Sequence, residues 1–224
     1  MFDRFDRIRI IRLRIRTDRR AEMLRELRKI GLADDPRVAF FDAIAPDAPG
    51  MFASNGYHGA FLSHLAVLRD AAQAGESVLV LEDDCDFLPG EYEVPECDVF
   101  YGGWLTASSA DMDQADIVGA HCMGLTAPAA ALAAAYFENL LDPAFPPDPV
   151  GAGSPGFNPA IRPTSDGAYV WFRRAHPHLV TGCVMMTTQR SSRSNVTPRW
   201  FFDRIPALMP LADLARRAKR MVMR

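Results

Sequence analysis

The sequence predicts an α/β protein with a mostly parallel central sheet flanked by helices. Runs of β-branched and apolar residues alternate along the chain with segments in which apolar residues recur every three or four positions. Residues 77–81 (SVLVL) are almost wholly apolar, which is typical of a strand covered on both faces in a parallel sheet. The 224 residues are 49% hydrophobic and 24% charged, a composition that is ordinary for a globular protein and excludes disorder as the main state.

The first half of the chain contains three predicted strands and two predicted helices. The strands are rich in β-branched and other apolar residues and lie at 8–15, 38–41 and 77–81. Each helix has one apolar face, and the two lie at 19–30 and 59–74. We expect Thr17 or Asp18 to cap the first helix and Gly31 to end it.

The second half continues the alternation around one long loop. Its predicted strands lie at 98–101, 121–125 and 179–187, and its predicted helices at 127–141 and 166–174. The loop at 142–165 is rich in proline and glycine, and a loop of this length is usually connected with function or mobility. We therefore expect one domain over 1–205, followed by a C-terminal tail at 206–224.

Charge is distributed unevenly along the chain. Residues 1–29 carry 11 basic and 5 acidic residues, and 199–224 carry 7 and 2, whereas 30–198 carry 7 basic and 21 acidic residues. The acidic middle opposes nucleic acid as the main ligand, and phosphates bound there would need a bridging cation. The tail at 206–224 has the pattern of a basic amphipathic helix, so contact with anionic lipid competes with a solvated terminal helix as its interpretation.

These features predict a cytoplasmic protein, peripheral at the inner face of a membrane if the tail binds lipid. No run reaches the roughly 18 apolar residues that a spanning helix needs. The charged first twenty residues lack the apolar core of a secretory leader. The cysteines are far apart and contain no CxxC pair, so neither a zinc site nor a disulfide framework is expected at Cys85, Cys97, Cys122 and Cys183.

Three adjacent carboxylates, Glu82, Asp83 and Asp84, follow the apolar run at 77–81. Ligands of open α/β sheets bind at the carboxyl ends of strands, and adjacent acids repel one another unless water or a cation intervenes. Mg²⁺ and Mn²⁺ prefer oxygen ligands and commonly bind one or two carboxylates together with substrate phosphates. Alternation along an extended chain would turn Glu82 and Asp84 one way and Asp83 the other. The alternative is a solvated acidic loop.

Further blocks of sequence stand around the acidic run in a definite order. Residues 16–20 (RTDRR) follow the first strand, and 59–64 (GAFLSH) belong to the second helix. After the acids come 98–103 (DVFYGG), 119–121 (GAH) and Asp166, followed by 189–195 (QRSSRSN). Over most of residues 5–205 this order and spacing resemble glycosyltransferase family 25, the group of lipopolysaccharide and collagen galactosyltransferases.

The resemblance implies a GT-A-like nucleotide-sugar domain and an inverting enzyme. A hexose, with galactose as the expected sugar, would pass from a UDP-sugar to a glycan such as lipopolysaccharide. The resemblance also implies Mn²⁺ or Mg²⁺ held by Glu82, Asp83 and Asp84. A carboxylate would deprotonate the acceptor hydroxyl, and the catalytic candidates are Asp166 and Asp84. The donor-binding candidates are Arg16, Asp18, Arg19, Ser63, His64, Glu82, Asp83 and Gln189.

Several candidates also have a purely structural interpretation. We expect His64 in the first turn of its helix, where it is either a donor-site group or a core histidine. Ser63 would otherwise cap that helix, and Asp166 would otherwise cap the helix at 166–174. The remaining alternatives are a salt bridge with Asp18 or Glu22 for Arg16 and Arg19, a surface turn for Gln189, Arg190 and Arg193, and a structural role for His121.

Two other functions compete with glycosyl transfer. The first is a non-catalytic nucleotide- or glycan-binding relic of the same fold, because Arg12 stands where family members usually have asparagine. Tyr57 and Asn195 depart from the family pattern as well. The second is a sugar nucleotidyltransferase, which the lack of a glycine-rich phosphate loop after the first strand disfavours.

Overall fold

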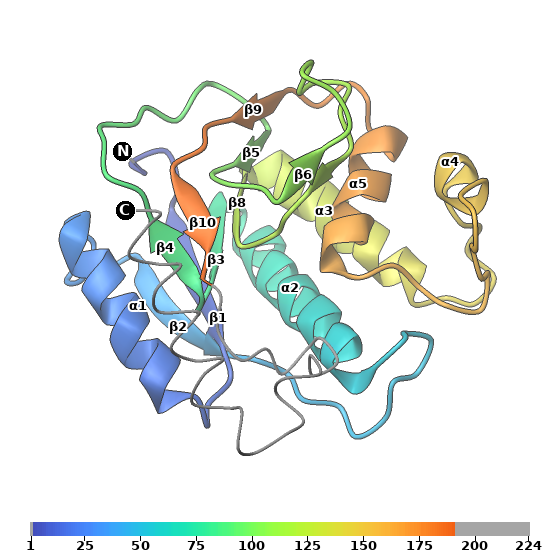
Figure 1. Cartoon of the computed structure of the whole chain (residues 1–224), viewed down its shortest axis with the longest axis horizontal. Helices are drawn as coiled ribbons and strands as arrows, with labels where there is room; N and C mark the ends of the chain where they lie inside the picture. Colours follow the sequence, from blue (N-terminus) through green and yellow to red (C-terminus); the bar gives the residue numbers. More distant parts are fainter. Residues whose placement is uncertain (1, 191–224) are drawn as a thin grey trace, which may run out of the picture.

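A computed structural model describes residues 2–190, which form a six-stranded sheet with helices on both faces (Figure 1). The strand order is β2-β1-β3-β8-β5-β9. The bounds of these strands are Val38–Asp42 (β2), Arg7–Arg12 (β1), Val78–Glu82 (β3), Cys122–Leu125 (β8), Val99–Tyr101 (β5) and Thr181–Cys183 (β9).

Most neighbouring strands of this sheet are parallel. β1 pairs in parallel with both β2 and β3, and β5 pairs in parallel with β9. β8 runs antiparallel to both of its neighbours, β3 and β5. The predicted α/β class with a mostly parallel sheet is therefore confirmed. Because β8 is reversed, its amino-terminal end lies beside the carboxyl end of β3, and the Glu82 amide donates to the His121 carbonyl at 3.0 Å.

The helices cover the two faces of the sheet unequally. Figure 1 shows α1 on one side of the sheet and α2, α3 and α5 on the other. A single-turn helix, α4, lies in the long loop. Their bounds are Thr17–Lys29 (α1), Asn55–Ala74 (α2), Ala127–Leu140 (α3), Pro149–Ala152 (α4) and Ser165–Ala175 (α5).

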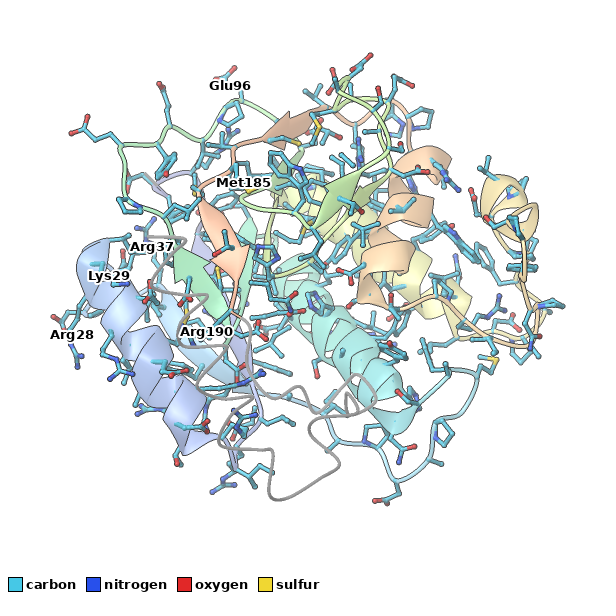
Figure 2. All side chains as sticks on the ribbon, viewed as in Figure 1. Arg28, Lys29, Arg37, Glu96, Met185 and Arg190 are labelled. Carbon is cyan, nitrogen blue, oxygen red and sulfur yellow. The ribbon has the colours of Figure 1, made fainter. Side chains whose placement is uncertain are left out.

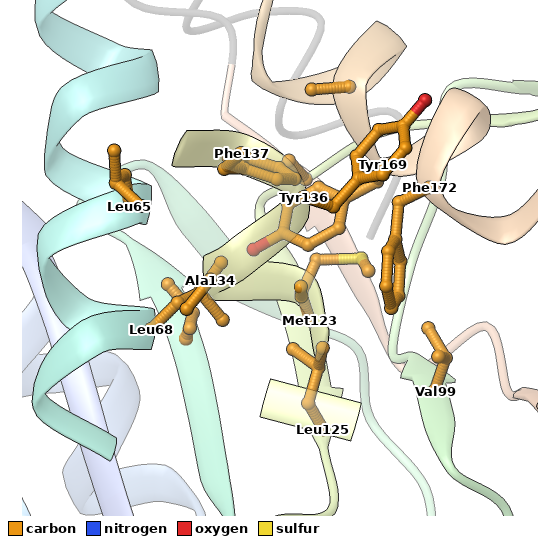
Figure 3. Close-up of a cluster of buried hydrophobic side chains, with 14 of the residues drawn as sticks. Leu65, Leu68, Val99, Met123, Leu125, Ala134, Tyr136, Phe137, Tyr169 and Phe172 are labelled. Atoms are coloured by element: carbon orange, nitrogen blue, oxygen red, sulfur yellow. The ribbon is translucent and has the colours of Figure 1, made fainter. Parts of the chain in front are cut away.

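The core is correspondingly divided into two layers by the alternation of side chains along each strand. Val78 and Val80 of β3 pack with the layer under α2, α3 and α5, while Leu79 and Leu81 pack with the layer under α1. Figure 3 shows the larger layer, where aromatic side chains of α3 and α5 meet leucines of α2. Burial of each such side chain contributes about 1.5–3 kcal/mol, so β3 is held firmly between the two layers.

The first helix differs from the prediction at its beginning but not at its end. α1 starts at Thr17 with Arg16 at the N-cap position, and no side chain caps it, so the expected cap by Thr17 or Asp18 is wrong. Its end is confirmed: Gly31 adopts φ 74°, and the Leu32 amide turns back to the Leu27 carbonyl at 2.9 Å.

The second helix begins four residues earlier than expected. Ser54 caps α2 by accepting a hydrogen bond from the Tyr57 amide at 3.2 Å, so Asn55 and Gly56 are helical although their types favour turns. His64 consequently lies in the middle of the helix and not in its first turn. The alternative role of Ser63 as the cap is wrong for the same reason.

The predicted strand at 179–187 is two strands with different partners. β9 belongs to the main sheet, whereas β10 (Thr187–Gln189) pairs antiparallel with β4 (Cys85–Phe87), directly after the acidic run. A further two-stranded pair joins β6 (Thr106–Ala107) and β7 (Ile117–Val118). The strand expected at 8–15 ends at Arg12, and Ile15 is 80% exposed.

No helix within residues 2–190 is long and apolar enough to cross a membrane. The predictions made for the tail at 206–224, for Arg193 and for Asn195 lie outside the described residues.

Candidate functional site

The acidic run lies at the carboxyl end of β3, with its backbone held from three sides. The Glu82 amide donates to His121 of the neighbouring segment, and the Asp83 amide donates to the Ile11 carbonyl of β1 at 3.1 Å. The Asp84 carbonyl accepts from the Arg190 amide at 2.6 Å. These bonds fix the direction of the three carboxylates.

Glu82 and Asp84 face the same neighbour, as predicted, although Asp83 and Asp84 form a turn between β3 and β4 and do not continue the strand. The Gln189 amide nitrogen, at the end of β10, lies 3.4 Å from Glu82 Oε2 and 3.5 Å from Asp84 Oδ1. Glu82 Oε1 lies 3.4 Å from His64 Nε2 on α2. The structure therefore brings four of the predicted site residues together at one strand end.

The Asp83 carboxylate pairs with an arginine of α1, which lies on the other side of the sheet. Arg19 Nη1, on the first turn of α1, lies 2.7 Å from Asp83 Oδ1 and 3.3 Å from Asp84 Oδ2. The side chains of all three residues are at most 11% exposed. Arg19 therefore partly neutralises the acidic run from within the protein, and the surface salt bridge that was its alternative role is wrong.

The electrostatic environment does not shift the pKa values of the three carboxyl groups in the same direction. Burial and the charge of Glu82 raise the pKa of Asp84 to about 7, despite the nearby Arg19. Burial also raises the pKa of Asp83. For Glu82 burial acts in the same direction, but contact with His64 and the proximity of His121 and Arg19 outweigh it and hold the pKa below its usual value. Glu82 is thus the one carboxyl group of the run whose pKa is shifted toward the ionised form.

His64 is oriented by two partners. Its side chain is 1% exposed, and while Nε2 faces Glu82, Nδ1 lies 3.2 Å from the hydroxyl of Tyr169 on α5. Sequence analysis did not identify Tyr169. Its phenolic ring also belongs to the buried aromatic layer, so the pattern of apolar residues on α5 conceals its polar contact.

Ser63 points away from the acids. Its hydroxyl donates to the Gly59 carbonyl at 2.6 Å and accepts from the Ile44 amide at 2.9 Å. Ser63 is completely buried and ties the segment after β2 to α2. The described contacts thus give Ser63, for which a donor-binding role was predicted, a structural role.

Asp166 is the second residue of α5 and lies close to the acidic run. The N-cap position is occupied by Thr164, so the alternative that Asp166 caps the helix is wrong. The Ala120 amide, beside His121, lies near the Asp166 carboxylate and acts to lower its pKa. Burial and the charge of Glu82 raise the pKa of Asp166 to about 6. A half-buried carboxyl group with this pKa is suited to exchange protons near neutral pH.

The two remaining donor-binding candidates pair with each other. The Arg16 guanidinium makes a bidentate contact with Asp18, with Nε 2.9 Å from Oδ1 and Nη2 2.7 Å from Oδ2. This hydrogen bonding lowers the pKa of Asp18 to about 2. The salt bridge with Asp18, which was the alternative interpretation of Arg16, is therefore present at the amino-terminal end of α1.

Arg190 tethers β10 to its surroundings. Its buried guanidinium lies between α1 and β4 (Figure 2), 2.8 Å from Glu22 and 2.9 Å from Asp86. This tether holds the preceding residue, Gln189, beside Glu82 and Asp84. The surface turn considered for Arg190 is wrong, because the residue is buried.

His121, for which a structural role was considered, also lies at the candidate site. It precedes β8, is 1% exposed, and lies close enough to Glu82 to influence its pKa. Neither ring nitrogen makes a hydrogen bond. Burial lowers the pKa of the imidazole. The signal that would have identified it is Gly103, which leaves room for this ring.

Within residues 2–190, no three His, Cys, Asp or Glu side chains are arranged as a metal site. The donor chemistry nevertheless fits a hard cation of the Mg²⁺ or Mn²⁺ type. Glu82 and Asp84 present carboxylate oxygens to the same amide group, and such ions commonly bind one or two carboxylates and complete their shell with water and phosphate. Asp83 is the least suited of the three acids, because Arg19 occupies it.

Neither a comparison with models of known protein families nor a search among curated proteins gives a match for this chain.

Proposed function

We propose that this chain is a nucleotide-sugar-dependent glycosyltransferase of the GT-A type, similar to family 25. The observation that carries the proposal is the pairing of Glu82 and Asp84 on one side of the carboxyl end of β3, beside His64 and Gln189. Ligands of open α/β sheets bind at this end of the strands. The order and spacing of the sequence blocks supply the choice of a UDP-sugar over other phosphorylated ligands.

Each residue would have a distinct part in this reaction. Glu82 and Asp84 would hold Mn²⁺ or Mg²⁺, with Asp83 as the third member of the acidic motif, and the ion would supply charge neutralisation for the diphosphate. Arg19 would keep Asp83 and Asp84 in place and add positive charge near the phosphates. His64, fixed by Tyr169, would orient Glu82, and Gln189 would hold both carboxylates at their common side.

Asp166 would act as the base. The acceptor oxygen would form a bond to the anomeric carbon while the bond from that carbon to the diphosphate oxygen breaks, which inverts the configuration. The acceptor proton would pass to the Asp166 carboxylate, and the bonding electrons would leave with UDP. A carboxyl group with a pKa of about 6 is sufficiently basic for this transfer and still ionised at neutral pH.

The resemblance also leads us to propose galactose as the sugar and a glycan such as lipopolysaccharide as the acceptor. A cytoplasmic position at the inner face of a membrane would bring the enzyme to such an acceptor. The basic tail at 206–224 would contribute through anionic lipid.

A non-catalytic nucleotide-binding protein is the second candidate, and one contact favours it. The guanidinium of Arg19 already bridges Asp83 and Asp84, so part of the charge that a metal would balance is balanced by the chain itself. Such a protein would bind UDP but would not turn over a sugar nucleotide.

The test is UDP-galactose hydrolysis and transfer in the presence of Mn²⁺, with and without chelator. We expect activity that chelator abolishes and that Asp84→Asn lowers by at least about 100-fold, since removal of one electrostatic contributor costs about 3 kcal/mol. Asp34→Asn makes the same chemical change at an exposed position and should leave activity unchanged. Binding of UDP without turnover would favour the second candidate, and full activity in chelator would refute the role of the metal.

A further inference from the structure

His121 combines deep burial with unused hydrogen-bonding capacity. Its backbone carbonyl accepts from the Glu82 amide, which fixes the residue at the strand end where the candidate site lies. The side chain is 1% exposed, and neither Nδ1 nor Nε2 has a hydrogen-bond partner. The Thr187 carbonyl lies nearby and raises the imidazole pKa slightly, but it does not complete a hydrogen bond of normal geometry.

Two glycines that follow β5 leave room for the start of β8 and for the His121 ring. A Cβ atom at Gly103, after β5, would lie 2.6 Å from His121 Nε2 and would overlap with the Thr187 carbonyl. A Cβ atom at Gly102 would overlap with Cys122 Sγ, on the residue after His121. The two glycines thus allow the start of β8, with its histidine, to lie against the end of β5.

An unpaired polar group in such a position is costly. A buried donor or acceptor without a partner destabilises the folded state by about 1–3 kcal/mol, and such exceptions in native proteins call for a functional explanation. The neighbouring residue also belongs to the site, because the Ala120 amide lies near the Asp166 carboxylate and acts to lower its pKa. Residues 120 and 121 therefore connect the proposed base with Glu82.

We propose that His121 is a substrate-binding residue whose imidazole holds a hydroxyl group of the transferred hexose beside Glu82. This inference rests on the proposed function and deepens it by assigning a residue to the sugar. The polar groups near the ring are the Glu82 carboxylate, the Thr187 carbonyl and the Thr187 hydroxyl, which donates its proton to the Gly102 carbonyl, so all three offer acceptors to the ring. They disfavour a phosphate, whereas a hydroxyl donates to a carboxylate and accepts from an imidazole N–H. The imidazole has at least one N–H in either protonation state.

The experiment compares two probes that differ only in the hexose. Binding of UDP and of UDP-galactose, both with Mn²⁺, is measured by titration calorimetry for the wild type, His121→Phe and His121→Gln. We expect His121→Phe to leave the affinity for UDP within about twofold and to weaken UDP-galactose about tenfold, as loss of one hydrogen bond predicts. His121→Gln, which keeps a donor and an acceptor, should recover part of the loss. The exposed His178→Phe serves as the control and should change neither affinity.

The outcomes separate the inference from the proposed function. If the wild type binds neither probe, the proposed function is wrong and the inference falls with it. If the wild type binds both probes and His121→Phe weakens them equally or not at all, only the role of His121 is refuted. A measurement on the wild type covers the case in which the variants do not fold. The ring ¹⁵N signals of His121 should shift on addition of UDP-galactose but not of UDP, and equal shifts with both would also refute the inference.

Discussion

The buried ion pair between Arg19 and Asp83 offers the most direct test of how the acidic run is stabilised. Arg19→Gln removes the guanidinium that lies 2.7 Å from Asp83 and 3.3 Å from Asp84. Two adjacent carboxylates would then remain buried without the guanidinium that contacts them both. Breaking a buried pair in this way costs about 3–5 kcal/mol, which is a large part of the roughly 5–15 kcal/mol that stabilises a typical domain.

The assay is urea unfolding followed by circular dichroism, in the presence of chelator. We expect Arg19→Gln to lower the free energy of unfolding by about 3 kcal/mol or more at pH 8. The loss should be smaller at pH 5, because protonation of Asp84, whose pKa is about 7, removes part of the charge that the guanidinium balances. The control is Arg16→Gln, which breaks the pair with the exposed Asp18 and should cost at most about 1 kcal/mol.

A double variant distinguishes the ion pair from other effects of Arg19. Arg19→Gln combined with Asp83→Asn removes both charges, so the double variant should be more stable than the sum of the two single losses predicts. The reasoning is refuted if Arg19→Gln costs less than about 1 kcal/mol at pH 8, since a pair of that strength would behave like an exposed one.

Two further predictions concern the pH dependence of stability and the room beside His121. Since the pKa of Asp84 rises from 3.8 to about 7 on folding, the folded state holds a proton that the unfolded chain has lost, and stability in chelator should fall as the pH rises from about 4 to about 7. Asp84→Asn should flatten this fall in the midpoint of urea unfolding, and an unchanged slope would contradict the assignment to Asp84. Gly103→Ala should lower stability by about 1–3 kcal/mol through overlap with Thr187 and His121, whereas Gly153→Ala meets only ordinary contacts and should change it little. Equal effects of the two glycine substitutions on the melting temperature would contradict the close packing at Gly103.

The parts of the site that depend on local periodicity could be predicted from the sequence. An apolar run followed by three acids predicted a buried strand with carboxylates at its carboxyl end, and β3 has this form. Alternation along the chain predicted that Glu82 and Asp84 share a side, which their common neighbour Gln189 confirms. The first prediction succeeds because a continuous apolar run suits a strand that is covered on both faces. The second holds for another reason, because Asp83 and Asp84 form a turn between β3 and β4, and the pairing of β10 with β4 brings Gln189 to both carboxylates.

Predictions failed where a residue's role depends on a partner elsewhere in the fold. Ser63 has the type and position of a helix cap, but Ser54 begins the helix and the Ser63 hydroxyl ties down Ile44 instead. Asp166 has the type of a helix cap as well, yet Thr164 takes the N-cap position and the Asp166 carboxylate lies near the Ala120 amide. A side chain that can make the same hydrogen bond locally or at a distance does not reveal its choice in its own sequence context.

The sequence by itself determined the α/β class and the position of the acidic run at a strand end. Only the tertiary structure decided what meets those carboxylates: a cation 64 residues earlier in the chain, at Arg19, and an amide more than 100 residues later, at Gln189. The physical reason is that side-chain direction follows from local backbone geometry, whereas contact between distant segments follows from how helices and strands pack. The hydrogen bonds and charges that set the chemistry of Glu82, Asp83 and Asp84 belong to that packing.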